Sequence, residues 1–134
     1  MLKILIADDE VSIILLIKKL ISRDIAHQIV GETTDGKSAL SMIEREKPDI
    51  VITDIRMPGL NGIEMIQAAR ELGSMAEFII ISGYKDFRYA QSAIRYGVLA
   101  YLLKPIKADE LNSALEQVQR KQGDRKAEDQ DRRY

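Results

Sequence analysis

Apolar residues follow two alternating patterns in this chain, short unbroken runs and longer stretches in which they recur every three or four positions. The short runs predict β-strands, and those without polar alternation predict strands buried on both faces of a sheet. We expect five strands, at residues 2–7, 28–32, 49–54, 78–82 and 98–103.

The longer stretches have the spacing of amphipathic helices. The stretch at 11–21 is rich in β-branched residues, which leaves a strand open, but its length favours a helix. A second helix follows the turn at Asp35-Gly36 and ends before Pro48, because the residue before a proline disfavours helical backbone. The other expected helices cover residues 63–73, 86–96 and 108–122.

Strands that alternate with helices require parallel pairing, with helices on both faces of the sheet. We therefore predict an α/β fold, a doubly wound five-stranded parallel sheet in the flavodoxin-like order 2-1-3-4-5 with five helices. A chain of 134 residues has room for one domain. We place this domain at residues 1–122 and expect residues 123–134, which are almost all charged or polar, to be a charged linker or disordered tail.

Composition excludes several functions. The net charge of −1 gives no basic excess for direct binding to nucleic acid. The longest purely apolar run, Ile13–Ile17, is far shorter than the ~20 residues of a membrane span. The chain contains no cysteine, so disulfides are impossible, and its first residues lack a signal-peptide pattern. We expect a soluble cytoplasmic protein with no membrane contact.

Polar residues stand where four of the predicted strands end. They are Asp8 and Asp9 after the first strand, Asp54 at the end of the third, Ser82 at the end of the fourth and Lys104 after the fifth. The carboxyl ends of parallel strands share one edge, where ligands bind. Three carboxylates brought together there repel one another and need protons or a cation.

Oxygen ligands that leave room for water suit Mg²⁺. A bound Mg²⁺ could hold a phosphoryl group against the Asp54 carboxylate, while Lys104 and the Ser82 hydroxyl neutralise the remaining phosphoryl oxygens. The reaction class that this suggests is formation of an aspartyl phosphate.

The same residues are compatible with other interpretations. Asp8-Asp9-Glu10 alone could be acids that stabilise a helix N-terminus. A Mg²⁺-dependent phosphohydrolase with an aspartate nucleophile is the main alternative function, but it needs Asp-x-Asp after the first strand. A flavodoxin-like mononucleotide binder needs a glycine-rich phosphate loop there, and the sequence has none.

Over residues 2–120 the chain resembles the receiver domains of two-component response regulators. The resemblance rests on Asp8-Asp9, on Asp54 followed by Met57-Pro58-Gly59 and Gly62, on Ser82-Gly83 and on Lys104-Pro105, in that order and spacing.

The resemblance implies a role for each of these positions. Asp54 matches the phosphoacceptor, Asp9 the direct Mg²⁺ ligand and Asp8 its neighbour that acts through water. The backbone carbonyl of Arg56 matches a further metal ligand. Lys104 matches the lysine that neutralises the phosphoryl group, and its bond to the following proline is usually cis in this family.

Ser82 and Tyr101 match the two switch residues that respond to phosphorylation. Arg56 and Tyr84 lie at the positions that tune hydrolysis, and we hypothesise that their bulk obstructs the attacking water. The single histidine, His27, matches no phosphoryl donor.

The resemblance also implies partners. The donor would be a phosphohistidine of a sensor histidine kinase, and the receiver would control an output domain or effector. The tracts at 82–87 and 103–105 look most like those of receivers joined to AraC-type DNA-binding domains. A homodimer could form through the face of the fourth helix, fifth strand and fifth helix. The implied protein is a signalling switch that catalyses only its own phosphorylation and slow dephosphorylation.

Overall fold

The sheet is parallel and five-stranded. The computed structural model describes residues 1–83 and 87–132, and in it the strands pair in the order β2-β1-β3-β4-β5. The strands are β1 (Leu2–Ala7), β2 (His27–Thr33), β3 (Ile50–Thr53), β4 (Glu77–Ser82) and β5 (Ala100–Leu103). All four pairings are parallel. The predicted fold class and strand order are confirmed.

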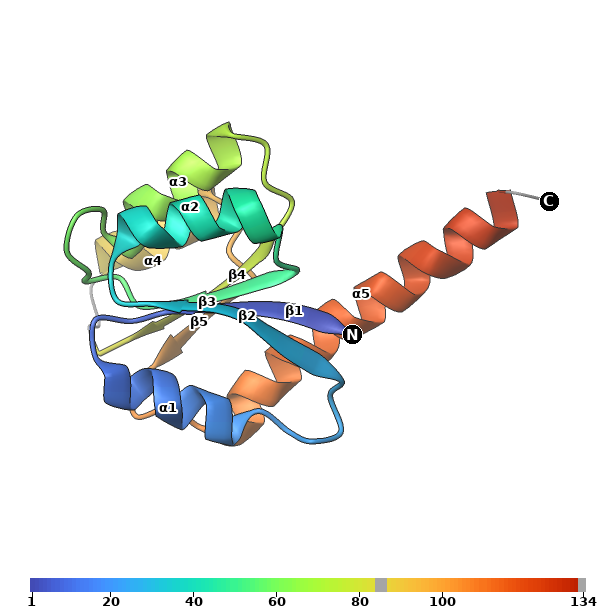
Figure 1. Ribbon diagram of the computed structural model, residues 1–134, viewed down its shortest axis with the longest axis horizontal. Coiled ribbons are helices and arrows are strands. Elements are labelled where there is room, and N and C mark those ends of the chain that lie inside the picture. The colour runs from blue at the N-terminus through green and yellow to red at the C-terminus, as the bar shows by residue number, and fades with distance from the viewer. Residues whose placement is uncertain (84–86, 133–134) are drawn as a thin grey trace.

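Helices cover both faces of this sheet. They are α1 (Val11–Leu20), α2 (Gly36–Glu46), α3 (Gly62–Glu71), α4 (Phe87–Arg95) and α5 (Ala108–Arg132). α1 and α5 lie on one face, and α2, α3 and α4 lie on the other (Figure 1). Among the described residues no helix is both long and apolar enough to span a membrane.

The core has two halves, one on each side of the sheet. In β3, Ile50 and Ile52 pack towards α1 and α5, whereas Val51 packs towards α2 and α3. Successive strand residues face opposite sides, so a strand covered on both sides needs apolar residues at every position. This is why the strand pattern shows no polar alternation and why the chain reaches the end of β3 fully buried.

Local chemistry sets the helix ends nearest the site. The Asp35 side chain accepts a hydrogen bond from Ser38 N–H and caps α2, which ends at Lys47 in the left-handed conformation (φ 47°). α3 begins with a capping box, in which Asn61 Oδ1 accepts from Glu64 N–H and Glu64 Oε1 accepts from Asn61 N–H.

Two helices differ from the prediction. α5 begins at Ala108 as expected, but the prediction that it ends near residue 122 is wrong, because the helix continues to Arg132 and extends away from the sheet (Figure 1). The sequence there is almost all charged or polar, a composition that is compatible with a helix as well as with a disordered tail. In α1 the apolar residues recur at helical spacing, which predicts that they face the core. Ile14 and Ile17 are buried, whereas Val11 and Leu15 are 60% and 51% exposed.

Candidate metal centre and acceptor carboxylate

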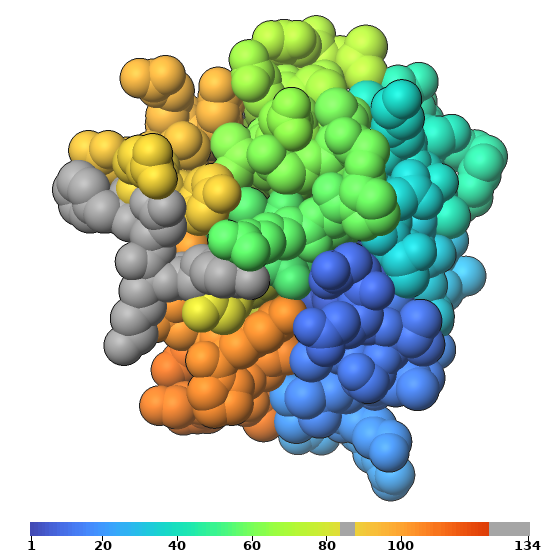
Figure 2. Space-filling view, turned by 90° about the vertical axis from the view of Figure 1, so that its left-hand side faces the viewer, coloured from blue at the N-terminus to red at the C-terminus, as the bar shows by residue number. Residues whose placement is uncertain are grey.

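The segments that follow β1, β3 and β5 lie together at the carboxyl edge of the sheet (Figure 2). The first two of these segments carry the three carboxylates that the sequence predicts as a group. Asp8 and Asp9 follow β1, and Asp54 follows β3 directly. The pairing of Ala7 with Thr53 sets the end of β1 beside the end of β3. Parallel register therefore brings the acids together.

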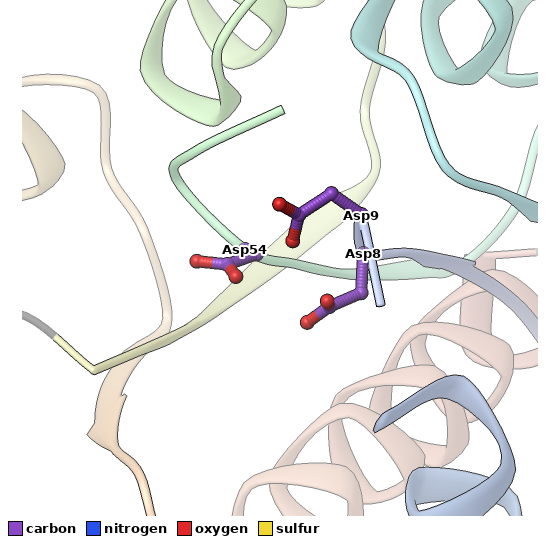
Figure 3. A group of neighbouring side chains, drawn as sticks. All are labelled: Asp8, Asp9 and Asp54. Carbon is purple, nitrogen blue, oxygen red and sulfur yellow. The ribbon is translucent and has the colours of Figure 1, made fainter. Parts of the chain in front are cut away.

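One oxygen from each of Asp8, Asp9 and Asp54 lies within 4.8 Å of the others. The three side chains project from the two strand ends towards the same side (Figure 3). Asp8 and Asp54 are buried, with 1% and 5% of their surface exposed, whereas Asp9 is exposed. Two carboxylates are thus withdrawn from water and the third is open to it.

Backbone N–H groups orient the two buried carboxylates. Ile55 N–H donates to Asp54 Oδ1 at 2.6 Å, and Glu10 N–H donates to Asp8 Oδ1 at 2.9 Å. Asp54 N–H itself donates to Ala7 O at 2.9 Å, which ties the acceptor residue to β1. One oxygen of each carboxylate is held by the backbone, and each Oδ2 remains for other partners.

Lys104 reaches both of these Oδ2 atoms. Its Nζ donates to Asp54 Oδ2 at 3.0 Å and forms an ion pair with Asp8 Oδ2 at 3.4 Å. The Lys104 backbone N–H donates to Ser82 O at 2.8 Å, which joins the ends of β4 and β5. The Lys104-Pro105 peptide bond is cis, as the resemblance implied. The lysine side chain is 20% exposed, so it closes the site on one side.

The electrostatics of the site favour positive charge. Burial, and after it the charge of Asp54, raise the pKa of Asp8 from 3.8 to about 6, although Glu10 N–H and Lys104 act in the opposite direction. For Lys104, burial works against the charged form, but the hydrogen bond and charge of Asp54, followed by those of Asp8, outweigh it and raise the pKa.

The donor set fits a divalent cation. Asp8 Oδ2 is buried and has no hydrogen-bond partner among the described residues, and one lysine faces three carboxylates. A buried carboxylate oxygen without a donor is costly unless a cation or proton compensates it. An all-oxygen set with one exposed member, Asp9, suits Mg²⁺, which retains part of its water shell.

The remaining predicted site residues lie around this centre. Ser82 is fully buried at the end of β4, and Arg56 is exposed in the loop after Asp54. Tyr101 on β5 is half-buried and packs against the core half on the α2 and α3 side. Tyr84, predicted to tune hydrolysis, lies outside the described residues.

Two glycines, Gly62 and Gly36, shape the loop between β3 and α3, a role that their positions in the sequence do not reveal. A Cβ on Gly62 would overlap the backbone carbonyl of Asp54, and one on Gly36 would overlap that of Leu60. Gly62 N–H donates to Ile55 O at 2.6 Å, and Gly36 N–H donates to Pro58 O at 3.2 Å. The contact of Gly36 with Pro58 joins residues distant in the chain, and that of Gly62 with Ile55 closes a turn. The spacing of residues in the sequence does not reveal such contacts.

One cleft of the molecule lies away from this site. A cleft of about 570 Å³ lies between the ends of α2, α3 and α5, and Asp49 and Glu77 at the starts of β3 and β4 contribute to its lining. It is at the opposite edge of the sheet from Asp54, so the candidate chemistry does not coincide with this cleft.

The fold and site together define a class of protein, a doubly wound domain that presents three clustered carboxylates, two of them buried, and a lysine at one sheet edge. Residues 4–116 match the family model of the response regulator receiver domain. The chain therefore belongs to the receiver domain family of two-component response regulators.

Individual relatives agree with this assignment. The chain is 38% identical over 119 residues to the uncharacterized transcriptional regulatory protein YesN of Bacillus subtilis, covering 88% of this chain and 32% of the relative. It is 39% identical over 116 residues to the transcriptional regulatory protein HptR of Staphylococcus aureus, covering 86% and 45%. The chain thus spans a third to a half of the length of these relatives.

A solved structure shows the same fold. The REC domain of AraT, a response regulator from Geobacillus stearothermophilus, superposes with a TM-score of 0.85 at 36% identity, covering 93% of this chain and 98% of that one.

Proposed function

We propose that this receiver accepts a phosphoryl group on Asp54 from the phosphohistidine of a sensor histidine kinase. The observation that carries the proposal is the position of Asp54, whose buried carboxylate lies within reach of two further acids and hydrogen-bonds Lys104 at 3.0 Å. A turnover enzyme with its nucleophile after the first strand would need Asp-x-Asp, and this chain has Asp8-Asp9-Glu10.

In the proposed transfer a carboxylate oxygen of Asp54 forms the new bond to phosphorus. The bond from phosphorus to the imidazole nitrogen of the donor breaks, and its electron pair stays on that nitrogen. Mg²⁺ held by Asp8, Asp9, Asp54 and the Arg56 carbonyl would offset the phosphoryl charge. Lys104, already beside Asp54, would move its Nζ from the carboxylate to a phosphoryl oxygen.

The switch residues follow from the same proposal. The Ser82 side chain would turn to the phosphoryl group. The side chain of Tyr101, on the neighbouring strand β5, would change position in response and so alter the face of α4, β5 and α5. Ser82 and Tyr101 lie on paired strands, with Ile80 opposite Tyr101 and Ser82 opposite Leu103. A phosphoryl group would favour the active arrangement by its differential contacts with the two states.

The proposed output is transcriptional control by a domain of AraC type that follows the receiver. Support comes from the relatives YesN and HptR, which are named as transcriptional regulatory proteins and of which the chain covers 32% and 45%. The proposed dimer face of α4, β5 and α5 exposes Ile94 (80%) and Leu103 (38%), large apolar side chains suited to contact with a partner.

The test is incubation of the purified chain with Mg²⁺ and acetyl phosphate, followed by intact mass measurement and peptide mapping. We expect one phosphoryl group, on Asp54, and none in Asp54→Asn or without Mg²⁺. Asp49→Asn is the matched control, because Asp49 lies at the opposite sheet edge, where its Oδ2 accepts from Lys3 N–H and the amide retains an acceptor. Modification at Asp8, or none, would contradict the proposal and favour the phosphohydrolase alternative.

We further propose that Arg56 and Tyr84 slow hydrolysis of the aspartyl phosphate by excluding the attacking water. Arg56 is exposed beside the acceptor. Substituting both residues with alanine should shorten the lifetime of the phosphorylated chain, measured by mass spectrometry after removal of acetyl phosphate. An unchanged lifetime would rule out this role.

A further inference from the structure

Arg70 donates to four backbone carbonyls in two segments, the loop before β4 and the end of α4, at the edge of the sheet opposite Asp54. This half-buried residue lies near the end of α3. Its Nη1 donates to Ala76 O at 2.8 Å and to Ser74 O at 3.3 Å, in the loop before β4. Its Nε donates to Tyr96 O at 3.3 Å, and Nη2 donates to Gly97 O at 3.5 Å. The guanidinium carbon lies 4.9 Å from the ring centroid of Phe78.

The last two acceptors lie just beyond the C-terminus of α4. Carbonyls at a helix C-terminus lack partners within the helix and carry the negative end of its dipole. A guanidinium donating to Tyr96 O and Gly97 O satisfies both needs. The same end is closed by backbone bonds, from Gly97 N–H to Ile94 O at 3.1 Å and from Val98 N–H to Ala93 O at 3.0 Å. Gly97 has the positive φ (68°) of such a helix end.

The rest of α4 is packed lightly. Among its described side chains only Ala93 is buried, Tyr89 is half-buried, and Ile94 is 80% exposed. Figure 2 shows α4, in yellow to orange, at the periphery of the molecule. A helix with few buried apolar contacts opens or shifts at low free-energy cost. The C-terminal end of α4 is therefore held by specific bonds, whereas the described side chains of the helix bury little apolar surface.

The two ends of α4 also differ in their relation to the site. The chain enters the helix from the side of Ser82 and Gly83, at the carboxyl edge of the sheet. It leaves at Gly97, beside Arg70 and the opposite edge. A change at Ser82 therefore acts first on the end of α4 that Arg70 does not hold.

We propose that Arg70 anchors the C-terminal end of α4, so that the rearrangement driven by phosphorylation is confined to the half of the helix nearer the site. Arg70 is a positioning residue in this device, since it touches none of the reacting groups. The inference rests on the proposed function for its trigger, while the anchor itself exists without phosphorylation.

The test uses pairs of spin labels attached to introduced cysteines. The chain has no native cysteine that would be labelled as well. A label at Ser41, exposed on α2, is the common reference, and the second label is placed at Arg88 or at Arg95, the two ends of α4. Distances are measured by pulsed electron resonance with and without Mg²⁺ and acetyl phosphate. In the otherwise native chain we expect the distance to residue 88 to change on phosphorylation and the distance to residue 95 to stay constant.

The decisive variants are Arg70→Met and Arg70→Lys. Arg70→Met removes the positive charge and all the guanidinium donors, whereas Arg70→Lys keeps the charge but not the planar set of donors that reaches the four carbonyls. Both should broaden the distance distribution to residue 95 before phosphorylation, and phosphorylation should then shift it. Gln67→Met, one turn earlier on the exposed face of α3, is the matched control and should behave as the native chain. If Arg70→Met fails to fold, Arg70→Lys carries the test alone.

Two results would overturn the inference. The first concerns the native chain on phosphorylation. There the inference fails if the distance from residue 41 to residue 95 changes as much as the distance to residue 88, or if the distance to residue 88 does not change. The other is an unbroadened residue-95 distribution in a folded Arg70 variant. Failure of the proposed function is separate, because mass spectrometry would then show no phosphoryl group on Asp54 while the unphosphorylated Arg70 comparison would still report the anchor.

Discussion

At the scale of single residues, the arrangement of acids that would bind a cation also places negative charges close together. Asp8 is buried beside another carboxylate and shares one lysine with it. Each group that would hold a cation is therefore a source of repulsion in its absence. This arrangement makes the metal dependence of stability a sensitive test of the site.

The raised pKa of Asp8 predicts how pH acts on the metal-free chain. Because the folded pKa of about 6 exceeds the ordinary value of 3.8, the folded state binds a proton more tightly than the unfolded state between these values. The contribution of Asp8 to stability is therefore greatest at low pH and falls as pH rises through about 6. Mg²⁺ needs the ionised carboxylate, so its stabilising effect should grow over the same range.

The measurement is the melting temperature with and without Mg²⁺ at about pH 5 and about pH 7.5, on either side of this transition. We expect a larger increase from Mg²⁺ at the higher pH. Asp8→Asn should melt higher than the native chain without Mg²⁺ at the higher pH, and Mg²⁺ should stabilise it little. A Mg²⁺ effect independent of pH in the native chain would contradict this assignment of Asp8.

Gly62 offers a second test at this scale, since the carbonyl of Asp54 leaves no room for a Cβ there. Gly62→Ala must displace the backbone of the acceptor residue, and we expect a loss of about 1–3 kcal/mol in the free energy of unfolding. Gly83→Ala is the matched control, because a Cβ there meets nothing within 4 Å. Chemical denaturation of both variants gives the comparison, and equal stabilities would show that the loop tolerates the shift.

At the scale of elements, the three central strands β1, β3 and β4 could be predicted because burial on both faces leaves an unbroken apolar pattern. Their parallel arrangement could be predicted from the alternation of strands with helices. Helix ends were predicted where a cap or a proline marks them, as at Asp35 and Pro48. The far end of α5 was not, because a run of alternating charges is compatible with both a disordered tail and a solvated helix. The acids of the site were found from their place at strand ends, whereas the roles of Gly36 and Arg70 depend on tertiary contacts.

The contact between α1 and α5 also depends on one such side chain. Asn112 Oδ1 accepts from Ser22 N–H at 2.8 Å, and its Nδ2 donates to Leu20 O at 2.9 Å and to Ala108 O at 2.8 Å. A single amide thus satisfies the backbone at the end of α1 from within α5.

Asn112→Ala should lower the free energy of unfolding by about 1–3 kcal/mol, because it leaves part-buried backbone groups without partners. Ser113→Ala, at the exposed neighbouring position, should change it little. Urea denaturation measures both. A cost no greater than that of Ser113→Ala would show that water replaces the amide bonds.

At the scale of the whole molecule, the remaining question is where the domain ends along α5. Among the side chains described in α5, those of residues 108–123, Val118 is the last in the buried core, with 3% of its surface exposed. Lys121 makes a partly exposed ion pair with Glu77 at 3.4 Å. Exposed ion pairs contribute little, at most about 1 kcal/mol. The folding free energy should therefore come almost entirely from residues up to Val118, even though the helix continues to Arg132.

A chain of residues 1–122 should keep the free energy of unfolding of the full chain to within about 0.5 kcal/mol. A chain of residues 1–117 lacks Val118 and should lose about 1.5–3 kcal/mol, the value of burying one such side chain. Denaturation of the three chains, with phosphorylation of Asp54 by acetyl phosphate as a second measurement, compares them directly. If the 1–122 chain is much less stable, the outer turns of α5 contribute to the receiver, and the proposed boundary at residue 122 must move outward along the helix.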